Sequence, residues 1–150
     1  MKALLMLAVL LMSVSGQAQE WSPDQEELWA VVSQSWVDDT GETGMWPDAF
    51  VHDNVVAWGA DWPVPRGKKS MSKWTRYRDA NSDMLEYELF PLAIVVEGST
   101  GVAHYSVVAF RKNSEGKSVR SVEGVIETLH KDNGVWKYLS LGGFSIDDGS

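Results

Sequence analysis

The side chains best suited to proton transfer in this sequence are Asp61 and His104. Asp61 lies close to Trp58 and Trp62, and a carboxylate between large aromatic rings can have a raised pKa and act as a general acid or base. His104 lies within a β-rich run, and inside a cavity it would exchange protons at neutral pH. Two alternatives stay open: a solvated Asp61 that caps a turn beside Pro63, and a His104 packed in a core or a dimer interface.

Other chemistries find no support in the sequence. Without Cys, His-x-His or His-Glu-x-x-His, the chain offers no thiol nucleophile, no disulfide and no recognisable metal site. No Gly-x-Ser-x-Gly turn is present to carry a nucleophilic serine. Glu123 and Glu127 share a strand face but lie about 13 Å apart along it. With Arg120 and Lys137 they are predicted to form surface or dimer salt bridges. Any chemistry is therefore expected to be proton transfer by single side chains, with neither cofactor nor metal.

Aromatic and basic residues suggest what could be bound. The chain has eight Trp, and pockets for small molecules have apolar walls with few polar groups. We predict a site for an apolar or aromatic ligand with these walls: Trp36, Trp58, Trp62 and Tyr138. Six basic residues fall between positions 66 and 78, namely Arg66, Lys68, Lys69, Lys73, Arg76 and Arg78. Their pattern favours a solvated helix face over a surface for an anionic ligand or lipid.

The length and the N-terminus indicate a single exported domain. A chain of 150 residues fits one domain, and its net charge of −8 argues against binding nucleic acid. Lys2 precedes ten apolar residues, and small residues stand three and one before a cut after Ala18, as in a secretory signal. The apolar run is shorter than the ~20 residues of a membrane span. We expect a signal peptide over 1–18, a mature domain over 19–150 and, because Cys is absent, a bacterial periplasmic location.

The elements that must position these residues are two helices and a sheet. Ser22, Pro23 and Gln25 predict the start of a helix that ends near Thr40. Residues 45–50 form a short helix or a turn, and His52–Asn54 is predicted as a turn. The remaining predicted elements are a short strand over 55–58, a loop over 61–65, a helix over 67–79 with Met71, Trp74 and Tyr77 on one face, and strands over 85–97, 102–112, 119–131 and 135–144. Gly- and Asn-rich connections make the four long strands an antiparallel meander.

Both faces of the long strands are apolar. In the second strand His104 faces one way and Tyr105 the other, among Val, Ala and Phe on both sides. In the first, Phe90, Leu92, Ile94 and Val96 are predicted to share a face, with a bulge or an edge position at Pro91. Two or three helices cover only one face, so the other is expected to pack on a second copy of the chain.

The order of these elements resembles the NTF2-like superfamily, especially its SnoaL-like and ketosteroid-isomerase-like branches. The resemblance rests on His52–Gly59, on Pro65-Arg66-Gly67-Lys68 before the second helix, and on the terminal hairpin Asp132–Tyr138. It covers about residues 22–145 and implies an α+β cone: a curved antiparallel sheet, four long strands plus a short one, wrapped over two or three N-terminal helices. It also implies a dimer through the sheet and a cavity for a small apolar or amphipathic molecule.

Two positions depart from the enzymatic patterns of that superfamily. Ketosteroid isomerases carry a general-base Asp where this chain has Trp58, and many SnoaL-like proteins carry a His where it has Leu141–Gly143. We expect an exported domain that binds a small apolar or aromatic molecule, with cofactor-free proton transfer through Asp61 and His104 if it is an enzyme. A non-catalytic dimerising or protein-binding module is the alternative. The sequence does not identify the ligand or the reaction.

Overall fold

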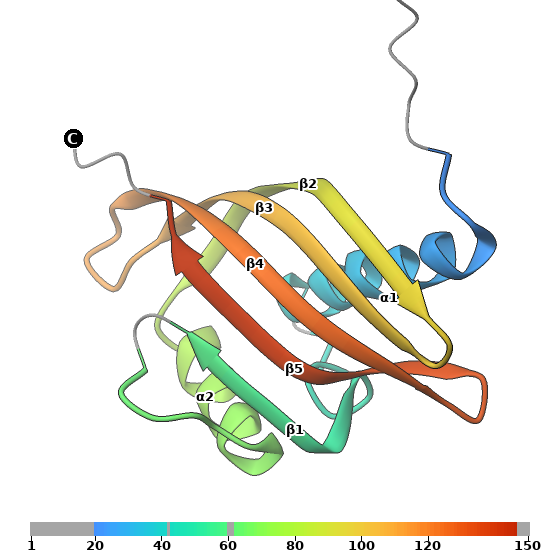
Figure 1. Cartoon of the computed structure of the whole chain (residues 1–150). Helices are drawn as coiled ribbons and strands as arrows, with labels where there is room; N and C mark the ends of the chain where they lie inside the picture. The colour runs from blue at the N-terminus through green and yellow to red at the C-terminus, as the bar shows by residue number, and fades with distance from the viewer. Residues whose placement is uncertain (1–19, 42, 60–61, 147–150) are drawn as a thin grey trace, which may run out of the picture.

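The computed structural model describes residues 20–41, 43–59 and 62–146, so Asp61 and the expected signal peptide lie outside the described residues. The fold is α+β, as predicted (Figure 1). Its elements follow the order α1 (Pro23–Thr40), β1 (Val51–Gly59), α2 (Lys68–Asp79), β2 (Asp83–Glu97), β3 (Thr100–Lys112), β4 (Ser118–Asp132) and β5 (Val135–Ser145). No helix in the described parts of the chain is long and apolar enough to cross a membrane.

Helix α1 begins where the sequence predicts it. The Gln25 amide donates to Ser22 Oγ at 3.4 Å, and the Ser22 amide donates to Gln25 Oε1 at 2.8 Å, which closes a capping box. Leu28 and Val32 are fully buried against the sheet. A side chain at Gly101 of β3 would collide with Leu28, so this glycine lets the helix approach the strand closely.

The sheet has the order β1-β5-β4-β3-β2, and strands β2 to β5 form the predicted antiparallel meander. Strand β1 pairs in parallel with β5, and it includes His52–Asn54, so the predicted turn at these residues is wrong. The pairing shifts between Val51 and Val56, and a bulge of this kind keeps turn-forming residues inside a strand. Residues 45–50 form a turn rather than a helix.

Strand β2 also changes register, between Pro91 and Ala93, as the proline predicts. The shift exchanges the faces of the strand, because an extra residue in one strand reverses the alternation beyond it. Leu89 and Ile94 therefore both contribute to the core, and the predicted common face of Phe90 and Ile94 is wrong.

Helix α2 buries the first part of the predicted face, but Tyr77 does not belong to it. Met71 and Thr75 are buried, whereas Tyr77 is 61% exposed. Trp74 is partly buried and packs edge-on against Trp62 at 6.2 Å between ring centroids. The face turned toward the sheet thus continues along positions 71, 75 and 78, and it brings Arg78 to the interior side of the helix.

The two faces of the sheet have different surroundings. Helix α1 packs on β2 and β3, and α2 packs on β1 (Figure 1). The face beneath the helices, here called the inner face, carries the fully buried Ala103 and Tyr105. The opposite, outer face exposes large apolar side chains on several strands: Phe90, Val95, Ile126 and Phe144.

Candidate functional site

A cavity of about 230 Å³, here called the inner cavity, lies between the helices and the inner face of the sheet. Helix α1 contributes Trp36 and Asp39, and α2 contributes Met71, Trp74, Thr75 and Arg78. Strands β3 to β5 contribute Tyr105, Arg111, Glu123, Val125, Glu127 and Leu141. The walls are thus mainly aromatic and aliphatic, with charged groups at a few points, as in sites for small organic molecules.

Three of the four predicted ligand-binding residues line the inner cavity: Trp36, Trp58 and Trp62. The indole of Trp36 donates to the Tyr105 hydroxyl at 2.9 Å, and that of Trp58 donates to the Trp62 carbonyl at 2.9 Å. Trp58 is 60% exposed, and its neighbours across the sheet, Gly142 and then Ile126, belong to the outer face, so it contributes to the rim of the cavity rather than to its interior. Tyr138 is fully buried and does not line this cavity, and ligand binding by all four residues stays a prediction.

Glu127 of β4 is the carboxyl group buried most deeply in this site, with only 5% of its surface exposed. The expectation that it forms surface or dimer salt bridges is wrong. Its neighbours across the sheet are Ala103 and Leu141, both on the inner face, so the strand turns its side chain toward the cavity. Its Oε2 atom has no hydrogen-bond partner in the described part of the chain.

Burial raises the pKa of Glu127 to about 8, and interactions with the hydroxyls of Tyr105 and Tyr138 oppose part of this rise. The cause is desolvation, because a low-dielectric interior disfavours the charged form of a carboxyl group. Burial and the charge of Glu127 in turn raise the pKa of both tyrosines. At neutral pH the cavity therefore holds a neutral carboxylic acid that can donate a proton or a hydrogen bond.

The hydrogen bonds behind Glu127 agree with this protonation state. Ser35 Oγ donates to the Val32 carbonyl at 2.8 Å and also contacts the Tyr138 hydroxyl at 2.7 Å. Since Ser35 has a single proton, the proton of the 2.7 Å contact comes from Tyr138. The Tyr138 oxygen can then accept a further hydrogen bond, so the position of Tyr138 does not require an ionised Glu127.

The two predicted catalytic residues are not brought together in the described residues. His104 alternates with the buried Ala103 and Tyr105 on β3, so it belongs to the outer face, and it is absent from the lining of the inner cavity. Its neighbours across the sheet are Ala93 and Ile126, and its Nδ1 atom has no hydrogen-bond partner there. The structure thus places His104 outside the inner cavity, and a catalytic role for this residue stays a prediction. Asp61 lies outside the described residues.

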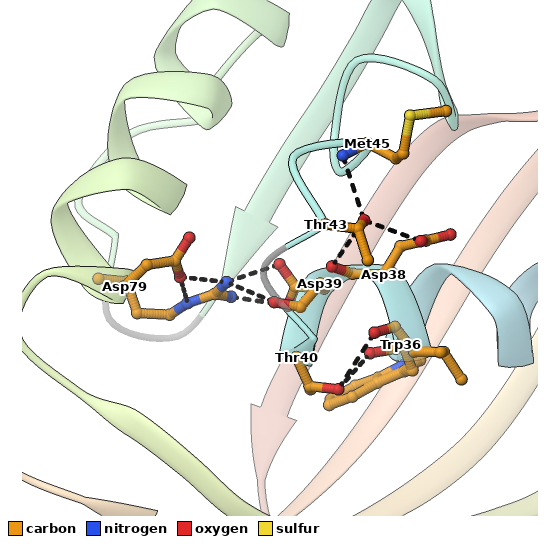
Figure 2. Close-up of polar contacts among 9 residues, drawn as sticks. Trp36, Asp38, Asp39, Thr40, Thr43, Met45 and Asp79 are labelled. Carbon is orange, nitrogen blue, oxygen red and sulfur yellow. Dashed lines mark hydrogen bonds and ion pairs between the residues drawn. The ribbon is translucent and has the colours of Figure 1, made fainter.

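One end of the inner cavity carries an ion-pair cluster. The Arg78 guanidinium binds both carboxylate oxygens of Asp39, at 2.6 and 2.7 Å, and it also binds Asp79 at 2.8 Å. Figure 2 labels the two aspartates, Asp39 and Asp79. Burial works against the charge of Arg78, but hydrogen bonds and Coulomb attraction from the two aspartates outweigh it and raise the pKa of this arginine. The predicted assignment of Arg78 to a solvated face is wrong, because the cluster joins α1 to α2.

A second depression, here called the outer cleft, adjoins the inner cavity at this end and has a volume of about 600 Å³. Trp62, Trp74, Arg78, Arg111 and Glu123 line both spaces. Arg66 lies 4.4 Å above the Trp62 ring and 4.9 Å from the Trp74 ring, so these aromatics are held by cation–π contacts. Within the described residues, no group of three or more potential ligands could hold a metal ion.

The fold is that of known NTF2-like proteins. A ketosteroid isomerase-like protein from Erwinia carotovora atroseptica superposes with a TM-score of 0.76 at 12% identity, over 85% of this chain and 99% of that one. An NTF2-like protein from Cytophaga hutchinsonii superposes with a TM-score of 0.71 at 10% identity, over 83% of this chain and 100% of that one. A candidate calcium/calmodulin-dependent kinase II association domain from Exiguobacterium sibiricum superposes with a TM-score of 0.69 at 9% identity, over 87% of this chain and 98% of that one.

These similarities concern the fold alone, because the identities are low. No protein-family model and no curated protein matches the sequence. The chain has the NTF2-like fold, as its sequence predicts.

Sequence reasoning missed Glu127 although a signal was present. Val125 and Leu129 flank it at two-residue spacing, so a carboxyl group stands in an apolar strand face. A charge in such a position is desolvated if that face is the inner one. Small residues Gly101 and Ala103 on the paired strand mark the face on which a helix can lie, and they could have identified it.

Proposed function

We propose that this protein is an exported domain that binds a small apolar or aromatic molecule in the inner cavity, where Glu127 donates a proton or a hydrogen bond to an oxygen of the ligand. The observation that carries the proposal is a buried carboxyl group with an unpartnered oxygen in an aromatic-lined cavity. Carboxylic acids kept neutral by burial are suited to stabilising negative charge that develops on a substrate oxygen.

The size of the cavity limits the ligand. Apolar cavities of ~150 Å³ hold benzene, and sites for drug-sized molecules measure ~300–1,000 Å³. A volume of about 230 Å³ therefore suits a ligand with one or two rings. The space persists although Trp36, Trp58 and Trp62 border it. This favours ligand binding over the alternative of a non-catalytic dimerising module, in which these side chains would fill the cone.

The reaction class that fits is proton transfer without a cofactor, as in an isomerase, a dehydratase or a hydrolase. Glu127 supplies the acid: its proton moves to a carbonyl or leaving-group oxygen, and the carboxylate regains a proton when the product forms. The complementary base is a second group, and Asp61 keeps its predicted role there because it directly precedes Trp62 in the sequence.

Binding of 2-acetylnaphthalene, a neutral ketone with two rings, tests the role of Glu127. Calorimetric titration between pH 6 and 9.5 is expected to give constant affinity at low pH and weaker affinity above about pH 8, where the acid loses its proton. Glu127→Gln keeps an amide donor and is expected to remove the pH dependence. The exposed carboxyl of Glu88 serves as the matched control, and Glu88→Gln should retain the native profile. Binding without pH dependence in the native protein contradicts the role of Glu127.

Exchange of the ketone's methyl hydrogens for deuterium in D₂O, followed by proton NMR, separates proton transfer from binding. General acid catalysis typically contributes ~10²–10⁴-fold, so Glu127→Gln should slow the exchange by at least ~10²-fold. A native protein that binds the ketone without accelerating exchange would be a binding protein rather than an enzyme, and it would contradict proton transfer by Glu127.

The proposal includes a periplasmic location and a homodimer. The sequence before residue 19 supports export, and N-terminal sequencing of the mature protein should give a start at Gln19. Exposed Phe90, Val95, Ile126 and Phe144 on the outer face, which neither helix covers, support pairing of two copies through the sheet.

A further inference from the structure

Arg111 of β3 is a partly buried cation without a hydrogen-bonded counterion. It lines both the inner cavity and the outer cleft, so it stands at the border between the two spaces. Its guanidinium makes no hydrogen bond or ion pair to any described residue. A guanidinium has five N–H donors, and a group that loses water on burial without gaining partners is costly.

Arg78, which lines the same two spaces, differs from Arg111 because its guanidinium is fully paired. Its guanidinium binds the carboxylates of Asp39 and Asp79 at 2.6–2.8 Å. Both aspartates are thereby occupied, and neither bonds to Arg111. The two arginines therefore differ in function: Arg78 joins the helices, whereas the donors of Arg111 remain available.

The charges around Arg111 do not neutralise it locally. Burial, and then the adjacent charge of Arg78, lower the pKa of Arg111, and attraction to Glu123 and Asp39 only partly compensates. Glu123 on β4 faces the same space but forms no hydrogen bond to Arg111. Each of these interactions acts at longer range than a direct ion pair.

A second unsatisfied donor lies on the neighbouring strand. Ser121 of β4 lines the outer cleft, and its buried hydroxyl has no partner in the described residues. Arg111 pairs with Val119 across the sheet and Ala109 pairs with Ser121, so Arg111 and Ser121 are diagonal neighbours on the same face. Two adjacent groups that can donate hydrogen bonds suit an acceptor with more than one oxygen.

We propose that the ligand of this protein is an amphipathic carboxylate, whose anionic group binds Arg111 and Ser121 while its rings occupy the aromatic-walled space beside Trp62 and Trp74. A carboxylate matches the planar fork of a guanidinium through two parallel hydrogen bonds. This inference rests on the proposed function, because it names the chemical class of the molecule that the cavity binds.

The negative net charge of the chain does not oppose such binding at short range. At physiological ionic strength, charges are screened over about 8 Å, so distant carboxylates contribute little. Of the two nearby carboxylates, Asp39 is paired with Arg78, which leaves Glu123 as the nearby charge that opposes an anion. The group in direct contact decides the outcome, and it is a partly buried guanidinium that binds no described residue. Such charge-assisted hydrogen bonds are about twice as strong as neutral ones.

Calorimetric titration at pH 7 and 0.15 M salt with 2-naphthoate and 2-naphthamide tests the proposal. The two probes share their rings and differ in the charge of one group. The native protein is expected to bind the carboxylate at least tenfold more tightly than the amide. Arg111→Gln should abolish that preference, lowering affinity for the carboxylate at least tenfold and leaving the amide unchanged. Arg120→Gln removes an exposed arginine of β4 and should keep the native preference.

Each outcome distinguishes this inference from the function on which it rests. Equal affinity of the native protein for both probes overturns the anionic site and leaves the cavity as a binding site. Failure of both probes to bind overturns the proposed function as well. 2-Naphthyl sulfate distinguishes the anion: binding tighter than that of 2-naphthoate overturns the choice of a carboxylate. The comparison of probes on the native protein stands even if Arg111→Gln does not fold.

Discussion

Replacing Glu127 by Gln should make the protein more stable at neutral pH. The side chain is 5% exposed, and burial raises the pKa of its carboxyl from 4.5 to about 8. The folded state therefore binds the proton more tightly than the unfolded state does. Below pH 4.5 both states are protonated and no penalty exists, whereas between pH 4.5 and 8 stability falls as pH rises. Above pH 8 the penalty is constant.

The magnitude follows from the pKa difference. Each pH unit within this window changes the free energy of unfolding by about 1.4 kcal/mol. At pH 7, two and a half units above the ordinary pKa, the native carboxyl costs on the order of 3 kcal/mol. Glutamine has nearly the same shape as glutamate but does not titrate. The free energy of unfolding of Glu127→Gln should therefore exceed that of the native protein by about this amount at pH 7 and equal it near pH 4.

Urea unfolding followed by tryptophan fluorescence, repeated between pH 4 and 8.5, measures this difference. The two stability curves should diverge steadily from pH 4.5 upward. Glu88→Gln, at an exposed position of β2, controls for the loss of a carboxylate from the sheet. Parallel curves for the native protein and Glu127→Gln would refute the argument that Glu127 is held neutral by burial. The same divergence in Glu88→Gln would show that the effect is not specific to the cavity.

Three further changes test the framework around the site. Gly101→Ala forces a methyl group into Leu28 and should lower the free energy of unfolding by ~1–3 kcal/mol in urea, and an unchanged midpoint would contradict the close packing of α1. Asp39→Asn removes the carboxylate that binds Arg78 through both oxygens, and it should lower the free energy of unfolding by on the order of 2 kcal/mol, a value between those of exposed and fully buried ion pairs. Adding salt to the native protein should not produce the same loss of stability, because the pair is partly buried. Ile126→Asp on the outer face should convert the proposed dimer into a monomer in light scattering, and a dimer that persists argues against pairing through the sheet.

The fold could be predicted from local signals that agree with one another. The capping box at Ser22 fixed the start of α1, and Gly- and Asn-containing connections separated the four long strands. The bulge near Pro91 followed from the missing amide hydrogen of proline. The exchange of faces beyond this bulge could not be predicted, because it depends on which of the two paired strands holds the extra residue.

The site was harder to predict because both faces of the sheet are apolar. His104 and Glu127 lie directly on paired strands, yet one faces outward and the other inward. Only the packing of α1 on Gly101 decides which face becomes the interior. Arg78 looked like part of a basic surface, since its partner Asp39 stands 39 positions earlier and only the tertiary fold brings the two together.

Binding of small molecules in the inner cavity can be followed directly through the tryptophans. Five of the eight line the cavity, namely Trp36, Trp46, Trp58, Trp62 and Trp74, whereas Trp21, Trp29 and Trp136 do not. We would titrate 2-naphthamide into ¹⁵N-labelled protein and follow the indole N–H signals, assigned by single Trp→Phe variants. Binding in the inner cavity should give saturable shifts for the five cavity tryptophans and little change in the other three. Shifts confined to the other three, or no saturable shift at all, would contradict it.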